Sequence, residues 1–321
     1  MKTLIIGGGG MVGQKLAHRL AQEPLPGCGA AEVTLLDTAF PPSGAPAANR
    51  VTGDLTDAKL LKSTLAGRFD LVFHLAAIVS GESETNFDLG WSVNMAAFRN
   101  LLEELRALAA AGHRTKLVFT SSIAVFGAPF PEKIGDEFFC APQTSYGAQK
   151  AISELMLNDY SRKGFVDGVS IRLPTICVRP GKANLAASSF FSGIIREPLN
   201  GAEALLPVPD DVRHWHASPR SAVGFLVRAA TLDTELLENR RALTMPGVSC
   251  TVAEQIEALR SVAGENPVKL IRREPDEAIM KIVSGWPRDF DPARALALGF
   301  EAESSFEDIV RIYMEDDLGR S

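Results

Sequence analysis

Residues 3–13 read Thr3-Leu4-Ile5-Ile6-Gly7-Gly8-Gly9-Gly10-Met11-Val12-Gly13, and they predict the architecture of the first half of the chain. The first four residues form a short aliphatic and β-branched run of the kind found in buried strands. Four glycines follow at once, and beyond them apolar residues recur at helical spacing, at positions 12, 16, 17 and 20. The order strand, glycine turn and helix predicts the opening unit of a parallel α/β domain.

The glycines at positions 7, 10 and 13 have GxxGxxG spacing. Such spacing permits a tight turn, lets the backbone approach a diphosphate, and lets the helix pack closely on the strand with its N-terminus facing the phosphates. Glycine-rich turns are common, so the flanking strand and helix are what favour a nucleotide site over an ordinary turn. We therefore predict diphosphate contacts from Gly7, Gly10, Met11, Val12 and Gly13.

The next apolar run, residues 32–36, ends in Asp37. An acid at this position accepts hydrogen bonds from the hydroxyls of an adenosine ribose and repels a 2′-phosphate. Neither Thr38 nor Ala39 supplies the positive charge that a 2′-phosphate needs, so the pattern favours NAD over NADP. The alternative is a polar residue that merely ends a strand.

Further strands and helices alternate up to residue 172. Strands are predicted at 51–55, 70–77, 116–120 and 166–172, and helices at 57–65, 85–111 and 146–163. This alternation predicts a doubly wound parallel sheet, the Rossmann fold, which binds ligands at the carboxyl ends of its strands. Asp54 and Leu55 end one strand and are expected beside the adenine. Ala76 and Ala77 end another, where small side chains let the backbone lie against a cofactor.

Tyr146 and Lys150 lie four residues apart, which places both side chains on one face of the predicted helix. A phenol keeps its proton to about pH 10, and a neighbouring cation stabilises the phenolate, so we expect Lys150 to lower the pKa of Tyr146. The pair Ser121-Ser122 ends the preceding strand. A base, an orienting hydroxyl and a nearby cation are what the oxidation of a secondary alcohol needs. An isolated YxxxK pattern is more often a surface tyrosine beside a solvated lysine.

Beyond residue 175 the pattern loosens into shorter segments separated by prolines, with helices predicted at 221–231, 251–263 and 305–314. We predict an NAD-binding domain over residues 1–175 and a mainly substrate-binding region over 176–321, some segments of which return to the sheet. His214 and His216 have an HxH spacing but no apparent third ligand, so no metal site is expected. His74, in a buried strand, is expected to be a hydrogen-bonded interior histidine.

The composition limits the partners. Apolar residues make up 46% of the 321 and charged residues 22%, with a net charge of −6, as in an ordinary globular protein. The absence of a basic run argues against nucleic acid and anionic membranes as partners. The four cysteines are widely separated, and no apolar run approaches the roughly 18 residues of a membrane span. We expect a cytoplasmic protein with reduced thiols that acts on a small molecule.

The glycine turn, Asp37, the run His74-Leu75-Ala76-Ala77, the serine pair and the YxxxK pattern stand in a distinctive order. In this the chain resembles the extended short-chain dehydrogenase/reductase family, the NAD-dependent epimerases and dehydratases, over about residues 1–182. The resemblance implies that Ser122 orients the substrate hydroxyl, Tyr146 accepts its proton and Lys150 holds the nicotinamide ribose. It also implies cofactor contacts from Leu75, Ala76, Ala77, Asn94, Pro174, Thr175 and Ile176.

The same resemblance implies a homodimer in which the helices near 85–111 and 145–163 pair across a two-fold axis. Phe126 stands where many members have Tyr, and Ser218-Pro219 stands near the family's usual acid, which suggests a remodelled substrate side. A non-catalytic dinucleotide sensor of this fold would normally lack the Tyr or the Lys, so an enzyme is expected.

Residues 172–181 and 213–219 bear on the substrate. They resemble one group in the family, whose members oxidise a four-carbon sugar acid at C2 with NAD. Their resemblance to the nucleotide-sugar epimerases is weaker, and an epimerase stays the alternative. A planar, bidentate arginine suits the carboxylate of such an acid. Arg179 is the first candidate and Arg213 the second, and either could instead be a structural ion-pair partner. Further substrate contacts are expected from Ser80, Ser122, Tyr146 and Thr175.

Overall fold

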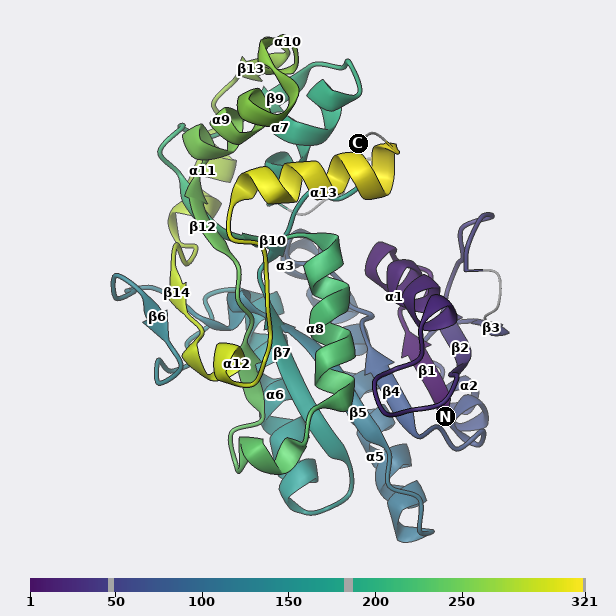
Figure 1. Ribbon diagram of the computed structural model, residues 1–321. Coiled ribbons are helices and arrows are strands. Elements are labelled where there is room, and N and C mark those ends of the chain that lie inside the picture. The colour runs from purple at the N-terminus through teal and green to yellow at the C-terminus, as the bar shows by residue number, and fades with distance from the viewer. Residues whose placement is uncertain (46–48, 182–186, 320–321) are drawn as a thin grey trace.

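The computed structural model describes residues 1–45, 49–181 and 187–319, and its centre is a seven-stranded sheet (Figure 1). The strand order is β11-β7-β5-β4-β1-β2-β3, and all neighbours are parallel. The chain winds from β1 outward to β3 and then crosses to β4 and the other half, which confirms the predicted doubly wound sheet. The strands are β1 Lys2–Ile6, β2 Glu32–Asp37, β3 Asn49–Thr52, β4 Leu71–His74, β5 Lys116–Ser122, β7 Asp167–Leu173 and β11 Ala242–Thr244.

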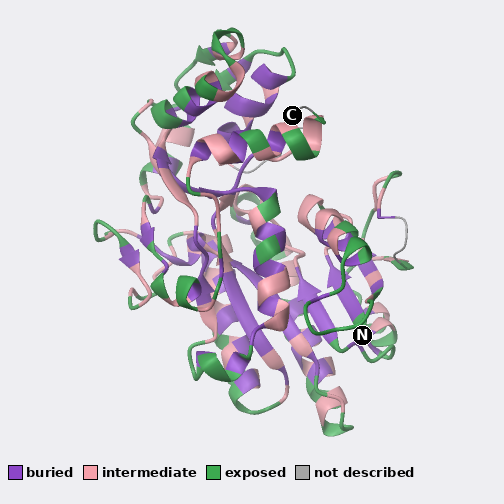
Figure 2. Ribbon diagram, in the orientation of Figure 1, coloured by how far each residue is buried: buried purple, intermediate pink, exposed green. Residues whose placement is uncertain are grey.

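Helices cover both faces of the sheet because its strands are apolar on both sides. Ile5 of β1 packs in a core with helices α1 (Met11–Gln22) and α8 (Pro219–Thr231). Its neighbours Leu4 and Ile6 point to the opposite face, where they join a second core with α2 (Ala58–Leu65), α5 (Ala97–Ala110) and α6 (Ser145–Arg162). Figure 2 shows the strands between these layers as buried.

The second half of the chain builds its own core above the carboxyl ends of the strands (Figure 1). Three small sheets support it: β8 (Thr175–Ile176) with β10 (Arg213–Ala217) and β12 (Val248–Thr251), β9 (Ala204–Leu206) with β13 (Ile271–Arg273), and β6 (Ile134–Gly135) with β14 (Phe290–Asp291). Its helices are α7 (Ser189–Leu199), α9 (Val252–Ala263), α10 (Glu265–Val268), α11 (Glu277–Ser284) and α13 (Phe306–Leu318), whereas α12 (Ala293–Ala297) lies against β11 and joins the core on the α8 face of the central sheet. Both β11 and α8 nevertheless pack with the central sheet, and a division at residue 175 stays a prediction.

The helix predicted over residues 85–111 is interrupted. The chain instead forms α3 (Ser80–Thr85), α4 (Phe87–Gly90), a π-helical turn (Trp91–Ala96) and then α5. The break comes at Asn86, whose side chain accepts a hydrogen bond from Leu89 N and so begins a new helix. The predicted starts at residues 57, 251 and 305 are capping residues, each of which accepts a hydrogen bond from the first turn of its helix.

His74 is interior but not hydrogen-bonded through its ring, which corrects the sequence prediction. Its side chain is 1% exposed, and neither ring nitrogen has a partner among the described residues. The ring packs edge-on against Phe98 at 5.1 Å and lies 5.7 Å from Phe119 between ring centroids. Burial, and secondarily the charge of Lys150, lowers the pKa of His74 to about 3. The aromatic cluster therefore holds a neutral imidazole.

Three buried histidines make the fold sensitive to acid. Burial lowers the pKa of His74 to about 3 and of His214 to about 4, and it places that of His216 well below the ordinary value. Unfolded histidines take up protons below about pH 6.5, so stability is fully present above that pH and is lost as the pH falls towards 4. Each histidine contributes a slope of up to about 1.4 kcal/mol per pH unit.

We expect urea unfolding between pH 6.5 and 4.5 to show this slope, and His74→Phe to remove about one histidine's share of it. His18→Gln, at an exposed position of α1, is the matched control because it removes a histidine that lies outside the core. An unaltered slope in His74→Phe would show that His74 is not the acid-sensitive group.

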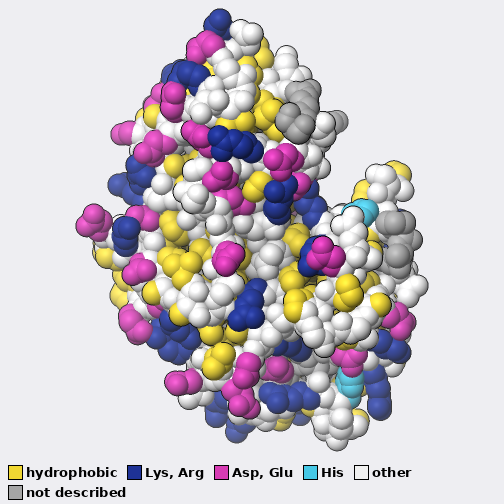
Figure 3. Space-filling model, in the orientation of Figure 1, with side chains coloured by type: hydrophobic (Ala, Val, Ile, Leu, Met, Phe, Trp, Pro, Cys, Tyr) yellow, Lys and Arg dark blue, Asp and Glu magenta, His cyan; other side chains and the backbone are white. Residues whose placement is uncertain are grey.

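No described helix has both the length and the hydropathy to cross a membrane. Acidic and basic side chains intermingle over the face in Figure 3. Cys28 and Cys140 are exposed, Cys177 and Cys250 are buried, and all four are free thiols. The cytoplasmic location expected from the sequence stays a prediction.

Candidate active site

A cavity of about 530 Å³ lies at the carboxyl ends of the strands, beside the point where the winding of the sheet reverses. The glycine turn, the ends of β4 and β5, and the start of α6 form one part of its wall. Segments around α7, β10 and residues 285–287 form the rest. Of the residues that the sequence singled out, its lining contains Gly7, Gly10, Met11, Val12, Gly13, Leu75, Ala77, Ser80, Ser122, Tyr146, Lys150, Pro174, Thr175, Ile176 and Arg179.

The glycine turn forms an open cradle at the N-terminus of α1. Gly7 has φ +85°, and a Cβ there would meet Ala76 N at 2.6 Å, while one on Gly13 would meet Gly7 O at 2.3 Å. Gly10 caps α1 without a side-chain hydrogen bond, and the first turn carries no acid. The backbone N–H groups at this end therefore need another partner, and a diphosphate fits that need.

Besides Asn94, four of the expected cofactor residues do not line the cavity: Asp37, Asp54, Leu55 and Ala76. Asp37 lies beside the glycine turn, where its carboxylate accepts hydrogen bonds from Gly9 N at 2.9 Å and Thr38 N at 2.7 Å. Asp54 accepts one from Thr56 N at 2.8 Å, and Leu55 is buried in the core beneath α5. Their contacts with adenosine stay predictions.

Asn94 does not line the cavity either, and its contact with a cofactor stays a prediction. The residue is 4% exposed, and its Oδ1 accepts from Ile78 N at 2.9 Å while its Nδ2 donates to Ile78 O at 3.0 Å. Nδ2 also donates to Gln149 Oε1 at 2.7 Å. Asn94 therefore ties the loop after β4 to α6, because these bonds use the polar atoms of its amide.

Ser122, Tyr146 and Lys150 meet at the cavity, but burial dominates the pKa of the phenol, and the expected lowering by Lys150 stays a prediction. Burial raises the pKa of Tyr146 to about 12, and a hydrogen bond with Ser122 and the charge of Arg179 counteract that rise. The Lys150 ammonium lies over the face of the phenol ring, 5.6 Å from its centroid. Helical spacing places Tyr146 beside Lys150, as the sequence predicted. Desolvation determines that the pKa of Tyr146 rises, and the sequence does not reveal how far a side chain is desolvated.

Lys150 is held away from solvent by the strand beneath it. Its side chain is 3% exposed, and Nζ donates to Thr120 O at 2.7 Å. Burial lowers the pKa of Lys150 to about 7, although the charge of Glu154 raises it. Arg172 holds Glu154 with three hydrogen bonds, of 2.9, 3.2 and 2.7 Å, and Ser121 donates to the same carboxylate. This buried ion pair below the lysine was not found by sequence reasoning.

The two arginines proposed for the carboxylate occupy different surroundings. Arg179 lines the cavity, with Nε donating to Ile176 O at 3.0 Å and Nη2 to Ser188 Oγ at 3.3 Å. Within the described parts of the chain, no Asp or Glu forms an ion pair with it. Arg213 is absent from the cavity lining; it donates to Ser249 O at 3.1 Å and pairs with Glu254 at 3.1 Å. This arrangement favours the structural ion pair that the sequence left open for Arg213, and its contact with a substrate stays a prediction.

Several lining residues carry no recognisable motif. Arg196 of α7 is 4% exposed, pairs with Glu197, and donates from Nη1 to Arg179 O at 2.8 Å. A lone arginine within the apolar run 189–199 is the signal that could have found it. Trp286 and Pro287 also line the cavity, and nothing in their local sequence predicts this.

Both histidines of the HxH pair have close polar neighbours within the protein. His214 Nδ1 is 2.8 Å from Pro287 O and Nε2 is 2.8 Å from Thr175 Oγ1, while His216 Nε2 lies 2.8 Å from Gln255 Nε2. No cluster of three or more His, Cys, Asp or Glu able to hold a metal occurs in the described residues.

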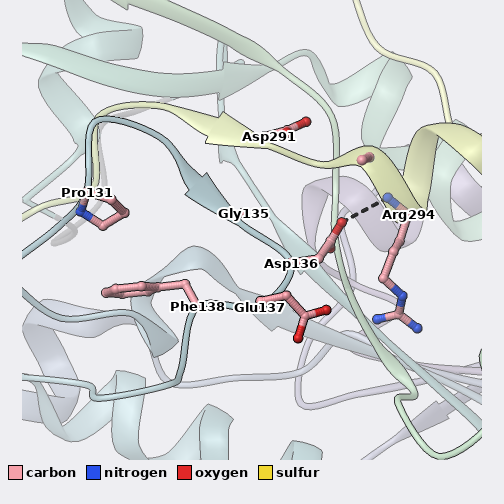
Figure 4. Close-up of a pocket in the computed structure, with 8 residues that line it drawn as sticks. Pro131, Gly135, Asp136, Glu137, Phe138, Asp291 and Arg294 are labelled. Carbon is pink, nitrogen blue, oxygen red and sulfur yellow. Dashed lines mark hydrogen bonds between the residues drawn. The ribbon is translucent and has the colours of Figure 1, made fainter.

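A second hollow of about 610 Å³ is larger, but its lining contains neither the glycine turn nor the serine, tyrosine and lysine that the sequence predicts to be catalytic (Figure 4). Of its charged residues, Asp136 accepts a hydrogen bond from the backbone N–H of Arg294 at 2.9 Å, and Glu137 pairs with Arg240. The chemistry of the lining, rather than its volume, identifies the first cavity as the candidate active site.

The fold and this cavity agree with the family comparison. Residues 3–217 match the NAD dependent epimerase/dehydratase family, and the chain belongs to that family. The resemblance to extended short-chain dehydrogenases and the expectation of NAD as cofactor are both confirmed. The chain is an NAD-dependent oxidoreductase of this family.

The chain is 49% identical to the D-erythronate dehydrogenase of Cupriavidus necator, over 98% of both chains, and 41% identical to that of Haemophilus influenzae, over 99% of this chain and all of the other. A solved structure described as a nucleoside-diphosphate-sugar epimerase from Agrobacterium tumefaciens is 54% identical, with a TM-score of 0.95 over all of this chain and 95% of that one. A monomeric L-threonine 3-dehydrogenase from a metagenome, 19% identical over 98% of each chain with a TM-score of 0.85, shares the fold.

Proposed function

We propose that this protein oxidises the C2 hydroxyl of D-erythronate to the corresponding keto acid, with NAD as hydride acceptor. The observation that carries the proposal is Arg179, a cation on the cavity wall close enough to Tyr146 to lower the pKa of its phenol. A carboxylate bound by Arg179 would place the adjacent carbon and its hydroxyl near Tyr146, because C1 and C2 are directly bonded. The names of the two similar dehydrogenases support the same substrate.

In this proposal Tyr146 first loses its own proton and then, as the phenolate, takes the proton of the C2 hydroxyl. Ser122, hydrogen-bonded to Tyr146, holds the same substrate oxygen in place. NAD, when bound, supplies the carbon that accepts the hydride. Gly10, Met11 and Val12 hold its diphosphate at the N-terminus of α1, and Lys150 holds the ribose next to the nicotinamide. Arg179 orients the acid, and its positive charge stabilises the phenolate of Tyr146 before the proton is transferred.

A nucleotide-sugar epimerase that retains its NAD is the second candidate. The description of the 54% identical structure and the family model both favour it. An epimerase returns the hydride to its substrate, so it would contain bound NAD and release no net NADH. A dehydrogenase would instead release one NADH for each acid oxidised.

The purified protein should be incubated with NAD and, separately, D-erythronate, other aldonic acids and UDP-sugars, while absorbance of NADH is followed. We expect NADH with D-erythronate and a 2-keto product on mass spectrometry after borodeuteride trapping. Epimerised UDP-sugar without NADH would establish the second candidate. No NADH with any acid would exclude the dehydrogenase, and a 3-keto product would exclude oxidation at C2.

We further propose that the protein is a homodimer through α4, α5 and α6. Leu155 on α6 is 71% exposed, and Phe87 and Trp91, whose rings lie 5.8 Å apart, are 56% and 37% exposed. These apolar side chains lie on the segments that the sequence predicted to pair. Light scattering at micromolar concentration should give twice the 34.5 kDa chain mass.

Leu155→Asp is expected to shift the dimer towards monomer by placing a charge in the shared face. Leu236→Asp, at a leucine that is 62% exposed elsewhere, is the matched control and should stay dimeric. A monomeric native protein, or equal behaviour of the two variants, would contradict the proposed interface.

A further inference from the structure

Thr175, His214 and Pro287 form a chain of hydrogen bonds that ends at the cavity. His214 joins the other two, with 2.8 Å from Nδ1 to Pro287 O and 2.8 Å from Nε2 to Thr175 Oγ1. All three residues line the cavity. Nothing in the roles of Ser122, Tyr146 and Lys150 requires this chain.

The direction of each hydrogen bond is fixed by elimination. A peptide carbonyl only accepts, so Nδ1 of His214 must carry a proton to bond with Pro287 O. His214 is 3% exposed, and burial lowers its pKa to about 4, so at neutral pH the ring carries a single proton. With that proton on Nδ1, Nε2 can only accept, and the hydroxyl of Thr175 must donate to it.

The ring of His214 is also locked in orientation. It stacks on Phe191 at 5.3 Å with an interplanar angle of 8°, and it lies 5.2 Å from Trp286 between ring centroids. A flip of the imidazole would break both hydrogen bonds, which would leave buried polar atoms without partners. The hydroxyl proton of Thr175 is therefore held towards His214 rather than free to turn.

A threonine hydroxyl has one proton, and in Thr175 that proton is donated to Nε2 of His214. Towards the cavity, Thr175 can offer only its remaining lone pairs. We propose that Thr175 is a fixed hydrogen-bond acceptor, positioned by His214 and Pro287, that recognises a non-reacting hydroxyl of the sugar-acid substrate. This inference rests on the proposed function and extends it. It assigns the recognition of the C3 or C4 hydroxyl to Thr175, which the fold restricts to accepting a hydrogen bond.

The surroundings of Thr175 favour substrate over cofactor as the donor. Thr175 begins β8, which pairs with β10 rather than with a strand of the central sheet. His214 lies on β10, and Pro287 follows α11. The elements that hold the Thr175 acceptor are therefore those on the side of the cavity away from the glycine turn and β4, where we place the cofactor. A site that accepts a substrate hydroxyl discriminates against an analogue without it, because the acceptor is then left unpaired.

The test compares wild-type protein with Thr175→Val, which has nearly the same shape but no hydroxyl, and with Thr175→Ser, which keeps it. Each is assayed by NADH formation with D-erythronate and with its 3-deoxy and 4-deoxy forms. Wild-type kcat/KM should fall about tenfold for one deoxy acid. Thr175→Val should fall by a similar factor with D-erythronate and show no further loss with that deoxy acid, whereas Thr175→Ser should resemble wild type.

His214→Phe tests the positioning role without relying on a single variant. The aromatic ring keeps the stacking but removes both nitrogens, so the Thr175 proton is released, and discrimination between D-erythronate and the same deoxy acid should shrink. NADH binding, measured by fluorescence titration, should not change in any variant. The ratio of kcat/KM between D-erythronate and the deoxy acid depends on whether Thr175 donates or accepts a hydrogen bond. A general loss of folded protein would lower both values equally and leave this ratio unchanged.

Separate outcomes distinguish the failures. Wild type that oxidises no acid overturns the proposed function and this inference together. Wild type that oxidises D-erythronate and both deoxy acids equally well overturns the inference alone. Weakened NADH binding in Thr175→Val, with equal loss for every acid, also overturns it and assigns the acceptor to the cofactor's carboxamide.

Discussion

Tyr146→Phe is expected to lower kcat by about 10³-fold, because it removes the proton acceptor and leaves the shape of the site intact. The phenol lies at the cavity beside Ser122, and burial raises its pKa to about 12, so its ionisation depends on nearby charges rather than on solvent. NADH affinity should change little, since the ring remains. Steady-state kinetics with D-erythronate and a fluorescence titration of NADH measure the two quantities.

Tyr160→Phe is the matched control for this variant. Tyr160 lies on the same helix, and its hydroxyl donates to Glu103 away from the cavity. The control should keep nearly full activity. Retention of activity by Tyr146→Phe would remove the central element of the proposed chemistry.

Arg179→Met should lower kcat/KM for D-erythronate by about 100-fold, through loss of a charge-assisted pair with the carboxylate. Methionine keeps an unbranched apolar chain along the wall, so the expected loss arises from charge and hydrogen bonding. An uncharged four-carbon polyol should lose much less, because it offers no carboxylate to Arg179. The ratio of kcat/KM for acid and polyol is therefore the decisive measurement.

Arg213→Met is the control that the chain itself supplies. At this position the substitution removes an ion pair with Glu254, whose side chain is 55% exposed. Because this pair lies outside the cavity, kcat/KM should stay within about twofold of the wild-type value. Equal losses in the two variants, or an unchanged ratio in Arg179→Met, would show that Arg179 does not bind the carboxylate.

The sequence predicted the glycine turn, the central sheet and the start of α6 because each depends on neighbours along the chain. Tyr146 and Lys150 share a helical face by spacing alone, and Gly7 and Gly13 are required by a turn that a Cβ would block. These features persist whatever packs above them.

Arg179 and Arg213 show where sequence reasoning reached its limit. Both are arginines in segments that resemble one group of enzymes, yet one lines the cavity and the other pairs with Glu254. Asn94 is a third case, since its amide bonds to Ile78 and Gln149 rather than facing the cavity. Which way a side chain faces in such segments depends on strands and loops far along the chain.

The amino-acid order alone determined a dinucleotide fold and brought together the glycine cradle and the tyrosine–lysine pair, because turns, strands and helices form through local spacing. Tertiary structure decided the electrostatics and the substrate side. Burial sets the pKa of Tyr146 near 12 and of Lys150 near 7. The folding of the chain also brings His214 to Pro287, 73 residues away in sequence, and to Thr175, 39 residues away. Desolvation and long-range contacts arise only when distant segments pack together.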